Sequence, residues 1–253
     1  MEEWKELGEE INRLLKLKTP TLGVKLFRRV EDIPSDVERI TWPCSVCQVL
    51  GIARYHDKAV AVTKDEATSC AIGGAALGFY EVPEDLKSGR RNVGLWARDQ
   101  EACRKLAEVA MIKAGTFSAM MASPLGKMSE KPDVVLVYGN PAQILTLIYG
   151  HVWVTGEKVR METTGHGGSC SEAIAAPYLT GEIRVAITDI GERKFALAYD
   201  YEMVMGIPYS RLPTLVEGLR EAYNAIYKYP APLHGLVPWE EGALRRAGLK
   251  PPS

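Results

Sequence analysis

The same order of segments occurs twice in this chain, and this repetition constrains the fold more than any other feature of the sequence. A strand-like run at 20–27, and again at 132–138, leads into a helical run that begins near a glutamine, Gln48 or Gln143. A further apolar run and a Ser-Cys pair ahead of small residues complete each copy. This order predicts a mixed α/β fold with two similar, intertwined halves, related by a pseudo-twofold axis as expected for an internal duplication.

The two copies align through their second strand and their Ser-Cys pair. Residues 59–63 correspond to 152–155, and both runs are predicted to be strands. Cys70 corresponds to Cys170, each at the start of a small-residue helix. The alternative interpretation is chance similarity between two short amphipathic segments. If the duplication holds, one compact domain spans 1–253 and contains an N-terminal helix at 1–18, a first repeat at 19–125, a second repeat at 131–229 and a C-terminal arm at 230–253.

Local patterns of apolar and turn-forming residues predict the remaining elements. The expected helices lie at 99–113 and 215–227, and the expected strands lie at 93–97, 183–188 and 194–199. The last two strands flank a charged loop at 189–193, which suggests a hairpin.

Charge and hydropathy exclude several classes of partner. Lys and Arg (31) nearly balance Asp and Glu (32), so the sequence lacks the basic footprint of a nucleic-acid-binding protein. The first residues form an amphipathic pattern rather than a signal peptide. The most apolar tract, 107–125, is interrupted by Lys113 and Pro124 and falls short of a membrane span. We therefore expect a cytoplasmic protein with neither a nucleic-acid nor a membrane partner.

Five cysteines, an odd number in a chain without an export signal, favour free thiols or metal ligands over disulfides. Cys44 and Cys47 have the Cys-x-x-Cys spacing that lets two sulfurs reach one metal. Cys70 and Cys170 are expected at helix N-termini, which stabilise thiolates. Around a shared axis, these four side chains would suit an iron–sulfur cluster or zinc. Packing as small hydrophobic residues and a reactive thiol site are the alternatives, and Cys103 is expected to pack.

The loop Gly165-His166-Gly167-Gly168 is the second informative segment. Glycines ahead of a helix let successive N–H groups point inward and form an anion-binding nest. His166 is a candidate proton donor beside the cysteine that follows, or else a solvated loop residue. Glu172 is a candidate acid, with neutralisation of the helix terminus as its other role.

Asn140 and Gln143 follow the strand-like run at 132–138, a position where α/β proteins place ligand-binding residues. A helix cap for Asn140 and a contact across the axis for Gln143 are the competing roles. Arg193 is a candidate for binding an anion, with a solvated hairpin turn as the alternative. Together with the glycine loop, these three residues form the candidate cofactor-binding set.

Several motifs are similar to those of one prokaryotic family. They are PCSVCQ at 43–48, SCAIGGAALG at 69–78, PDVVLVYGNPAQ at 132–143, SC at 169–170, APYLTG at 176–181 and GER at 191–193. On these motifs the chain resembles domain of unknown function 169 over roughly residues 15–220. The resemblance implies no activity. Many relatives carry a further cysteine shortly before the Gly-x-Arg loop, but residues 187–190 contain none here, so no role of such a cysteine transfers.

Three hypotheses about function follow, and the sequence does not decide whether the chain is an enzyme. The first is a redox or cofactor-binding protein with an iron–sulfur cluster between the halves and a redox partner. The second is a metal-free enzyme or binding protein for a small anionic metabolite. The third is a structural protein that forms a homo-oligomer through its small-residue helices.

One geometric prediction is common to the first two hypotheses. Cys70 and Cys170 should lie near each other at the N-termini of equivalent helices, on the wall of one cleft between the halves. A cluster in that cleft would take Cys47 and Cys44 as its remaining ligands, whereas without a cluster the cleft would be a small-ligand pocket.

Overall fold

The computed structural model describes residues 2–225 and 228–231. Nearly all of the predicted C-terminal arm therefore lies outside the described residues. Its strands are β1 (Leu22–Phe27), β2 (Glu38–Arg39), β3 (Val60–Thr63), β4 (Ala119–Pro124), β5 (Val134–Gly139), β6 (Arg160–Met161), β7 (Arg184–Ile187) and β8 (Met203–Pro208). Its α-helices are α1 (Glu3–Leu15), α2 (Val46–Tyr55), α3 (Ala71–Ala76), α4 (Glu84–Lys87), α5 (Gln100–Leu106), α6 (Pro141–Thr155), α7 (Ala176–Thr180), α8 (Ile190–Phe195) and α9 (Leu212–Ala225). A π-helix, η4 (Gly168–Ala175), runs directly into α7, and short 3₁₀ helices form η1 (Val30–Asp32), η2 (Arg90–Asn92), η3 (Leu125–Lys127) and η5 (Tyr209–Arg211).

In the described part of the chain, the strands form one eight-stranded mixed sheet in the order β2-β3-β4-β1-β5-β8-β7-β6. This confirms the predicted mixed α/β class. β1 and β5 are antiparallel neighbours at the centre, and the edge pairs β2–β3 and β6–β7 are parallel. The order read outward from the centre is therefore the same on both sides: a long strand, two antiparallel neighbours and a short parallel edge strand.

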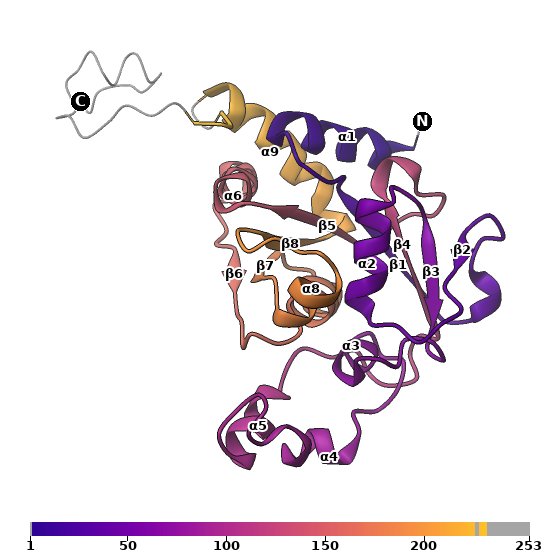
Figure 1. Cartoon of the computed structure of the whole chain (residues 1–253). Helices are drawn as coiled ribbons and strands as arrows, with labels where there is room; N and C mark the ends of the chain where they lie inside the picture. The colour runs from indigo at the N-terminus through magenta and orange to yellow at the C-terminus, as the bar shows by residue number, and fades with distance from the viewer. Residues whose placement is uncertain (1, 226–227, 232–253) are drawn as a thin grey trace.

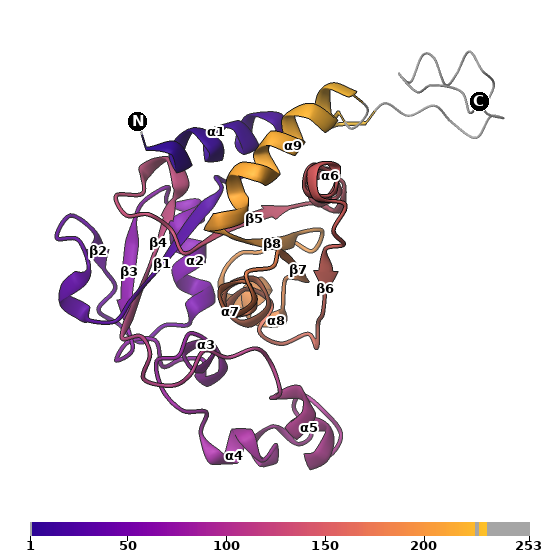
Figure 2. The same ribbon diagram turned by 180° about the vertical axis from the view of Figure 1, so that it is seen from behind.

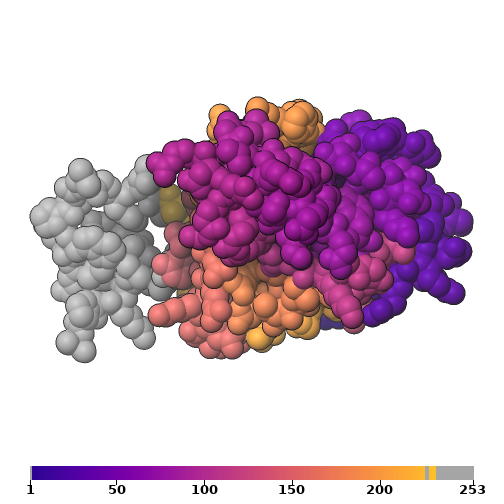
Figure 3. All heavy atoms as spheres, turned by 90° about the horizontal axis from the view of Figure 1, so that it is seen from below, coloured from indigo at the N-terminus to yellow at the C-terminus, as the bar shows by residue number. Residues whose placement is uncertain are grey.

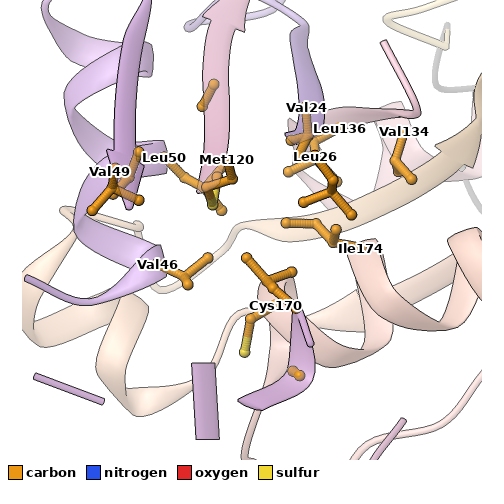
Figure 4. Packing of buried hydrophobic residues seen from close by; sticks show 14 of the residues in the cluster. Val24, Leu26, Val46, Val49, Leu50, Met120, Val134, Leu136, Cys170 and Ile174 are labelled. Atoms are coloured by element: carbon orange, nitrogen blue, oxygen red, sulfur yellow. The ribbon is translucent and has the colours of Figure 1, made fainter. Parts of the chain in front are cut away.

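Helices cover both faces of the sheet (Figures 1 and 2). Alternate residues of a strand point to opposite faces, so Met121 packs with α1, α6 and α9, while its neighbour Met120 packs with α2 and η4. Figure 4 shows Val46 of α2 and Cys170 and Ile174 of η4 beneath Val24, Leu26 and Met120 of the sheet. The fold is thus three-layered, with the cysteine-bearing helices on one face of the sheet.

Four local predictions are wrong. Residues 152–155 are the end of α6 rather than a strand, which removes their match to β3. Residues 194–199 do not form the second strand of a hairpin, because α8 begins at 190 and ends at 195. The run at 93–97 makes only an isolated bridge, and the helix expected at 99–113 is limited to α5.

The other predicted elements are confirmed. The N-terminal amphipathic helix is α1, the strand-like runs at 20–27 and 132–138 contain β1 and β5, and the last predicted helix is α9 within the described residues. Among the residues that the structure describes, no helical segment combines the length and the hydropathy of a transmembrane span.

Candidate functional site

The amino ends of α2, α3, η4 and α8 meet around one cavity of about 530 Å³. Cys47 lines it from the first turn of α2, Cys70 from the N-cap of α3 and Cys170 from the first turn of η4. Asp189, the N-cap of α8, lines the remaining side. The structure therefore brings together three cysteines that lie far apart in the sequence.

Local capping interactions explain why each helix begins at the cavity. Ser45 and Gln48 form a capping box at the start of α2, with the Ser45 N–H donating to Gln48 Oε1 at 2.9 Å. Asp189 and Glu192 form a second capping box at the start of α8. Gly167, with a φ of 67°, is the N-cap of η4, a left-handed conformation that glycine adopts without strain.

Asp189 also joins α8 to the glycine loop. Its Oδ1 accepts the N–H of Glu192 at 2.9 Å, and its Oδ2 accepts the N–H of Gly168 at 3.0 Å. One carboxylate therefore satisfies a free N–H group at the start of each of two helices. This contact fixes the glycine loop against the wall of the cavity.

A buried polar network lies directly behind this wall. Glu192 Oε2 accepts the N–H of Asp189 at 2.9 Å, and its Oε1 accepts the hydroxyl of Ser169. The Tyr138 hydroxyl lies 2.6 Å from Ser169 Oγ and 3.1 Å from Glu192 Oε1. Burial, and then the charge of Asp189, raises the pKa of Glu192 to about 7. This carboxyl group therefore changes protonation near neutral pH.

The cavity thiols are held in the neutral form. Burial raises the pKa of Cys47 and Cys170 well above the ordinary thiol value, and carboxylates and neighbouring thiols add to the effect. Burial also raises the pKa of Cys70, although backbone N–H groups of Gly73 and Ile72 partly oppose it. The helix termini therefore do not offset desolvation, and these side chains are weak hydrogen-bond donors at neutral pH.

His166 lies in the cavity wall against a tryptophan from a distant segment. The Trp96 and His166 ring centroids are 4.2 Å apart with an interplanar angle of 80°. Nε2 of His166 is buried and has no hydrogen-bond partner among the described residues. Burial lowers the pKa of His166, and the Asp189 charge opposes this shift. The imidazole is thus a neutral polar group with an unused hydrogen-bonding atom.

Gly165 and Gly167 of the predicted nest also line the cavity. The predicted site residues that do not line it have local structural partners. Asn140 and Gln143 form the capping box of α6, and Gln143 Nε2 donates to Leu15 O at 2.9 Å. Arg193 donates to the carbonyls of Thr188 and Tyr199.

Three further predicted residues lie near the cavity without lining it. Gly168 donates its N–H to Asp189. Glu172 is buried in η4, which raises its pKa. Cys44 is fully buried, and burial raises its pKa to about 11. Cys103, expected to pack, is buried in α5.

The cavity does not provide the ligand set of a metal centre. Within residues 2–225 and 228–231, no group of three or more His, Cys, Asp or Glu side chains is arranged to hold a metal ion. Cys44, the proposed fourth ligand, lies outside the cavity lining. The side chains present therefore do not fit an iron–sulfur cluster or a structural zinc, which needs four converging ligands.

Sequence reasoning missed Trp96, Asp189 and Lys194 as cavity residues. The signal for Asp189 was present, because Asp-x-x-Glu at 189–192 is a capping box that marks a helix start. The alternating apolar residues after it suggested a strand instead. Trp96 had no local signal, since only the tertiary fold brings its segment to the glycine loop.

Comparisons with known proteins found one matching family and one similar protein from an archaeon. The model of DUF169, described as uncharacterised ArCR, matches residues 10–218. The uncharacterized protein MJ0308 of Methanocaldococcus jannaschii is 27% identical over 219 residues, which cover 86% of this chain and 94% of that protein. No solved structure matches the chain at a significant level.

Proposed function

The chain belongs to the DUF169 family, and we propose from the geometry of its cavity that it binds a small anionic metabolite there without a metal ion. The observation that carries this proposal is the convergence of four helix amino ends on one cavity. Each such end carries a partial positive charge, which favours an anionic guest.

Side-chain charge supports the same ligand class. Lys194 lines the cavity and forms no ion pair with any other described residue. The carboxylate of Asp189 opposes an anion, but both of its oxygens already accept backbone N–H groups. An acidic group of the ligand would therefore lie toward Lys194 and the glycine loop. The unused Nε2 of His166 offers a further polar contact.

The rest of the wall favours a ligand that also has an apolar part. Ile72, Trp96, Ile190 and Phe195 all line the cavity. A volume of about 530 Å³ is in the range of small-molecule sites. A metabolite with one acidic group and an apolar body matches both the shape and the chemistry of this wall.

A thermal-shift screen with carboxylates, phosphates and nucleotides, followed by calorimetry on the hits, tests the proposal. Lys194→Gln should raise the Kd of a hit about tenfold, the effect of losing one charge-assisted contact. Lys64→Gln is the matched control, because Lys64 is exposed and does not line the cavity. Unchanged melting with the whole panel would argue against this function, as would equal affinities of the two variants.

Gly167→Val is an independent test of the glycine loop. A Cβ at Gly167 would lie 2.9 Å from Cβ of Ser171, in a left-handed backbone conformation that valine rarely adopts. The substitution should displace the loop and abolish binding of a hit. Wild-type affinity in a folded Gly167→Val protein would show that the loop does not contact the ligand.

The internal duplication is also proposed, with a corrected alignment. The sheet order supports it, because the same series of elements then occurs on both sides of the sheet centre. The first series is β2, α2, β3 and α3, and the second is β6, the η4–α7 helix, β7 and α8. In this alignment Cys70 corresponds to Asp189, and both are helix N-caps in the cavity wall. An experimental structure in which 38–76 and 160–195 fail to superpose would contradict the duplication.

A further inference from the structure

The chain makes a long excursion between two neighbouring strands. β3 and β4 are antiparallel and pair from Val60↔Ala122 to Thr63↔Ala119, yet residues 64–118 lie between them. We call residues 79–115 the inserted segment. It leaves and returns beside α3, where Ile112 N donates to Ala76 O and Phe117 N donates to Gly78 O. A hairpin turn of a few residues would be enough to connect β3 and β4. The connection is therefore much longer than the pairing of these two strands requires.

The middle of the inserted segment is held together by its own contacts, whereas its ends are anchored in the core of the body through Phe79 and Ile112. Arg91 forms a two-bond ion pair with Asp85, and Gln100 Nε2 donates to Ser88 O at 3.1 Å. α4 and α5 pack against η2 rather than against the sheet. Figure 1 shows α4 and α5 beyond α3, away from the sheet, and Figure 3 shows this part of the chain, in magenta, nearest the viewer. The segment therefore forms a small unit that lies over the body.

Its contact with the glycine loop lies in the cavity wall, and its contact with η4 lies next to Cys170 of that wall. Trp96 lines the cavity and packs its ring against His166 of the glycine loop. Near the end of the segment, Ala110 O accepts the hydroxyl of Ser171 in η4 at 2.8 Å. Trp96 is 39% exposed and its neighbour Leu95 is 72% exposed. The indole thus extends from an exposed turn onto the cavity wall.

We propose that the inserted segment is a lid over the cavity, and that Trp96 closes it by packing against His166. This inference rests on the proposed function only in that the cavity is taken to receive a ligand. A closed lid buries Nε2 of His166 and places an indole in the ligand site. Trp96 then favours ligands with an apolar group, because such a group packs against the face of the indole that is directed into the cavity.

Thiol labelling measures the lid without any ligand. Cys170 lines the cavity and is only 2% exposed, so N-ethylmaleimide reaches it after local opening. Trp96→Ala should raise the labelling rate of Cys170, read by peptide mass spectrometry, by about threefold to tenfold, the effect of losing one aromatic pair. Cys44 does not line the cavity, so its rate should stay at the wild-type value.

Leu95→Ala is the matched control, because Leu95 is adjacent and does not line the cavity. Trp96→Phe keeps an aromatic ring against His166 and should label close to the wild-type rate. Equal Cys170 rates in Trp96→Ala and Leu95→Ala would overturn the lid. A rise in Cys44 labelling equal to that of Cys170 would also overturn it, since that pattern indicates general unfolding.

An NMR titration of His166 gives a second readout. Burial lowers its pKa in the closed lid, so Trp96→Ala should move that pKa upward toward the ordinary value, while Leu95→Ala should not. An unmoved pKa in folded Trp96→Ala contradicts the lid. Faster Cys170 labelling in Trp96→Ala together with no hit in the ligand screen would reject the proposed function and keep the lid. A ligand hit together with unchanged Cys170 labelling in Trp96→Ala would reject the lid and keep the proposed function.

Discussion

Arg54 of α2 donates through Nη2 to Glu202 Oε1 at 2.6 Å, and both side chains are almost completely buried. The same guanidinium donates to Thr19 Oγ1 at 3.2 Å and lies 3.7 Å from the ring centroid of Tyr138. Because Tyr138 also contacts Ser169, this ion pair adjoins the network behind the cavity wall. It joins α2 to the segment just before β8.

Removing one partner of this pair should be strongly destabilising. Glu202→Ala leaves the Arg54 charge buried without a counter-ion, so we expect a loss of about 3–5 kcal/mol in the free energy of unfolding. The double variant Arg54→Met with Glu202→Leu should recover much of that loss, because no buried charge remains. Urea denaturation of Arg54→Met, Glu202→Leu and the double variant that combines them measures the coupling. Additive losses would show that the two charges do not depend on each other.

The buried carboxyl of Glu192 should make stability depend on pH. Its pKa is raised to about 7 in the folded state from an ordinary value of 4.5. Between these values the unfolded chain releases a proton that the folded chain keeps, so stability falls as pH rises from about 4.5 to about 7. The full effect is about 3 kcal/mol at most. Below 4.5 the group is protonated in both states and contributes no slope.

Glu192→Gln removes this titration. Its free energy of unfolding, measured in urea at several pH values, should lack the fall between about pH 4.5 and 7 that Glu192 contributes. The slope is the informative quantity, because the amide also places a donor near the Asp189 N–H and so changes absolute stability. Identical slopes in the variant and the wild type would show that Glu192 keeps an ordinary pKa.

Gly206 should tolerate no side chain. A Cβ there would lie 1.9 Å from the carbonyl oxygen of Ala173, where β8 passes under η4. Gly206→Ala must separate the π-helix from the sheet, and we expect a loss of about 3 kcal/mol or more. Gly126→Ala is the control, since its nearest neighbour, Glu9 Oε1, would be 3.7 Å away. Equal melting temperatures of the two variants would contradict this close packing.

Metal analysis decides between the cluster hypothesis and the proposed metal-free site. Because the described residues place no converging set of ligands at the cavity, we expect anaerobically purified protein to be colourless, without stoichiometric iron or zinc. Elemental analysis and a visible spectrum check this. Broad visible absorption with bound iron, lost together in Cys70→Ser and Cys170→Ser, would restore the iron–sulfur prediction.

The local pattern of apolar and polar residues was sufficient to predict the elements whose sequences are strongly apolar or strongly periodic. β1 and β5 are buried along nearly their whole length, and α1 carries one apolar stripe, so their sequences allow one interpretation. The residues after Asp189 allow two. Phe195, Leu197 and Tyr199 alternate like a strand, but all three are exposed, and the capping box at Asp189 starts a helix instead.

Neighbouring residues alone were enough to predict the mixed α/β class, the helix starts near Cys47, Cys70 and Cys170, and the glycine loop, because each of these depends on local sequence. The three-dimensional fold was needed to show that these cysteines share one cavity with Asp189 and Lys194, and that Trp96 packs on His166. Those contacts join residues far apart in the chain. They depend on the order of the strands in the sheet, and no local propensity specifies that order.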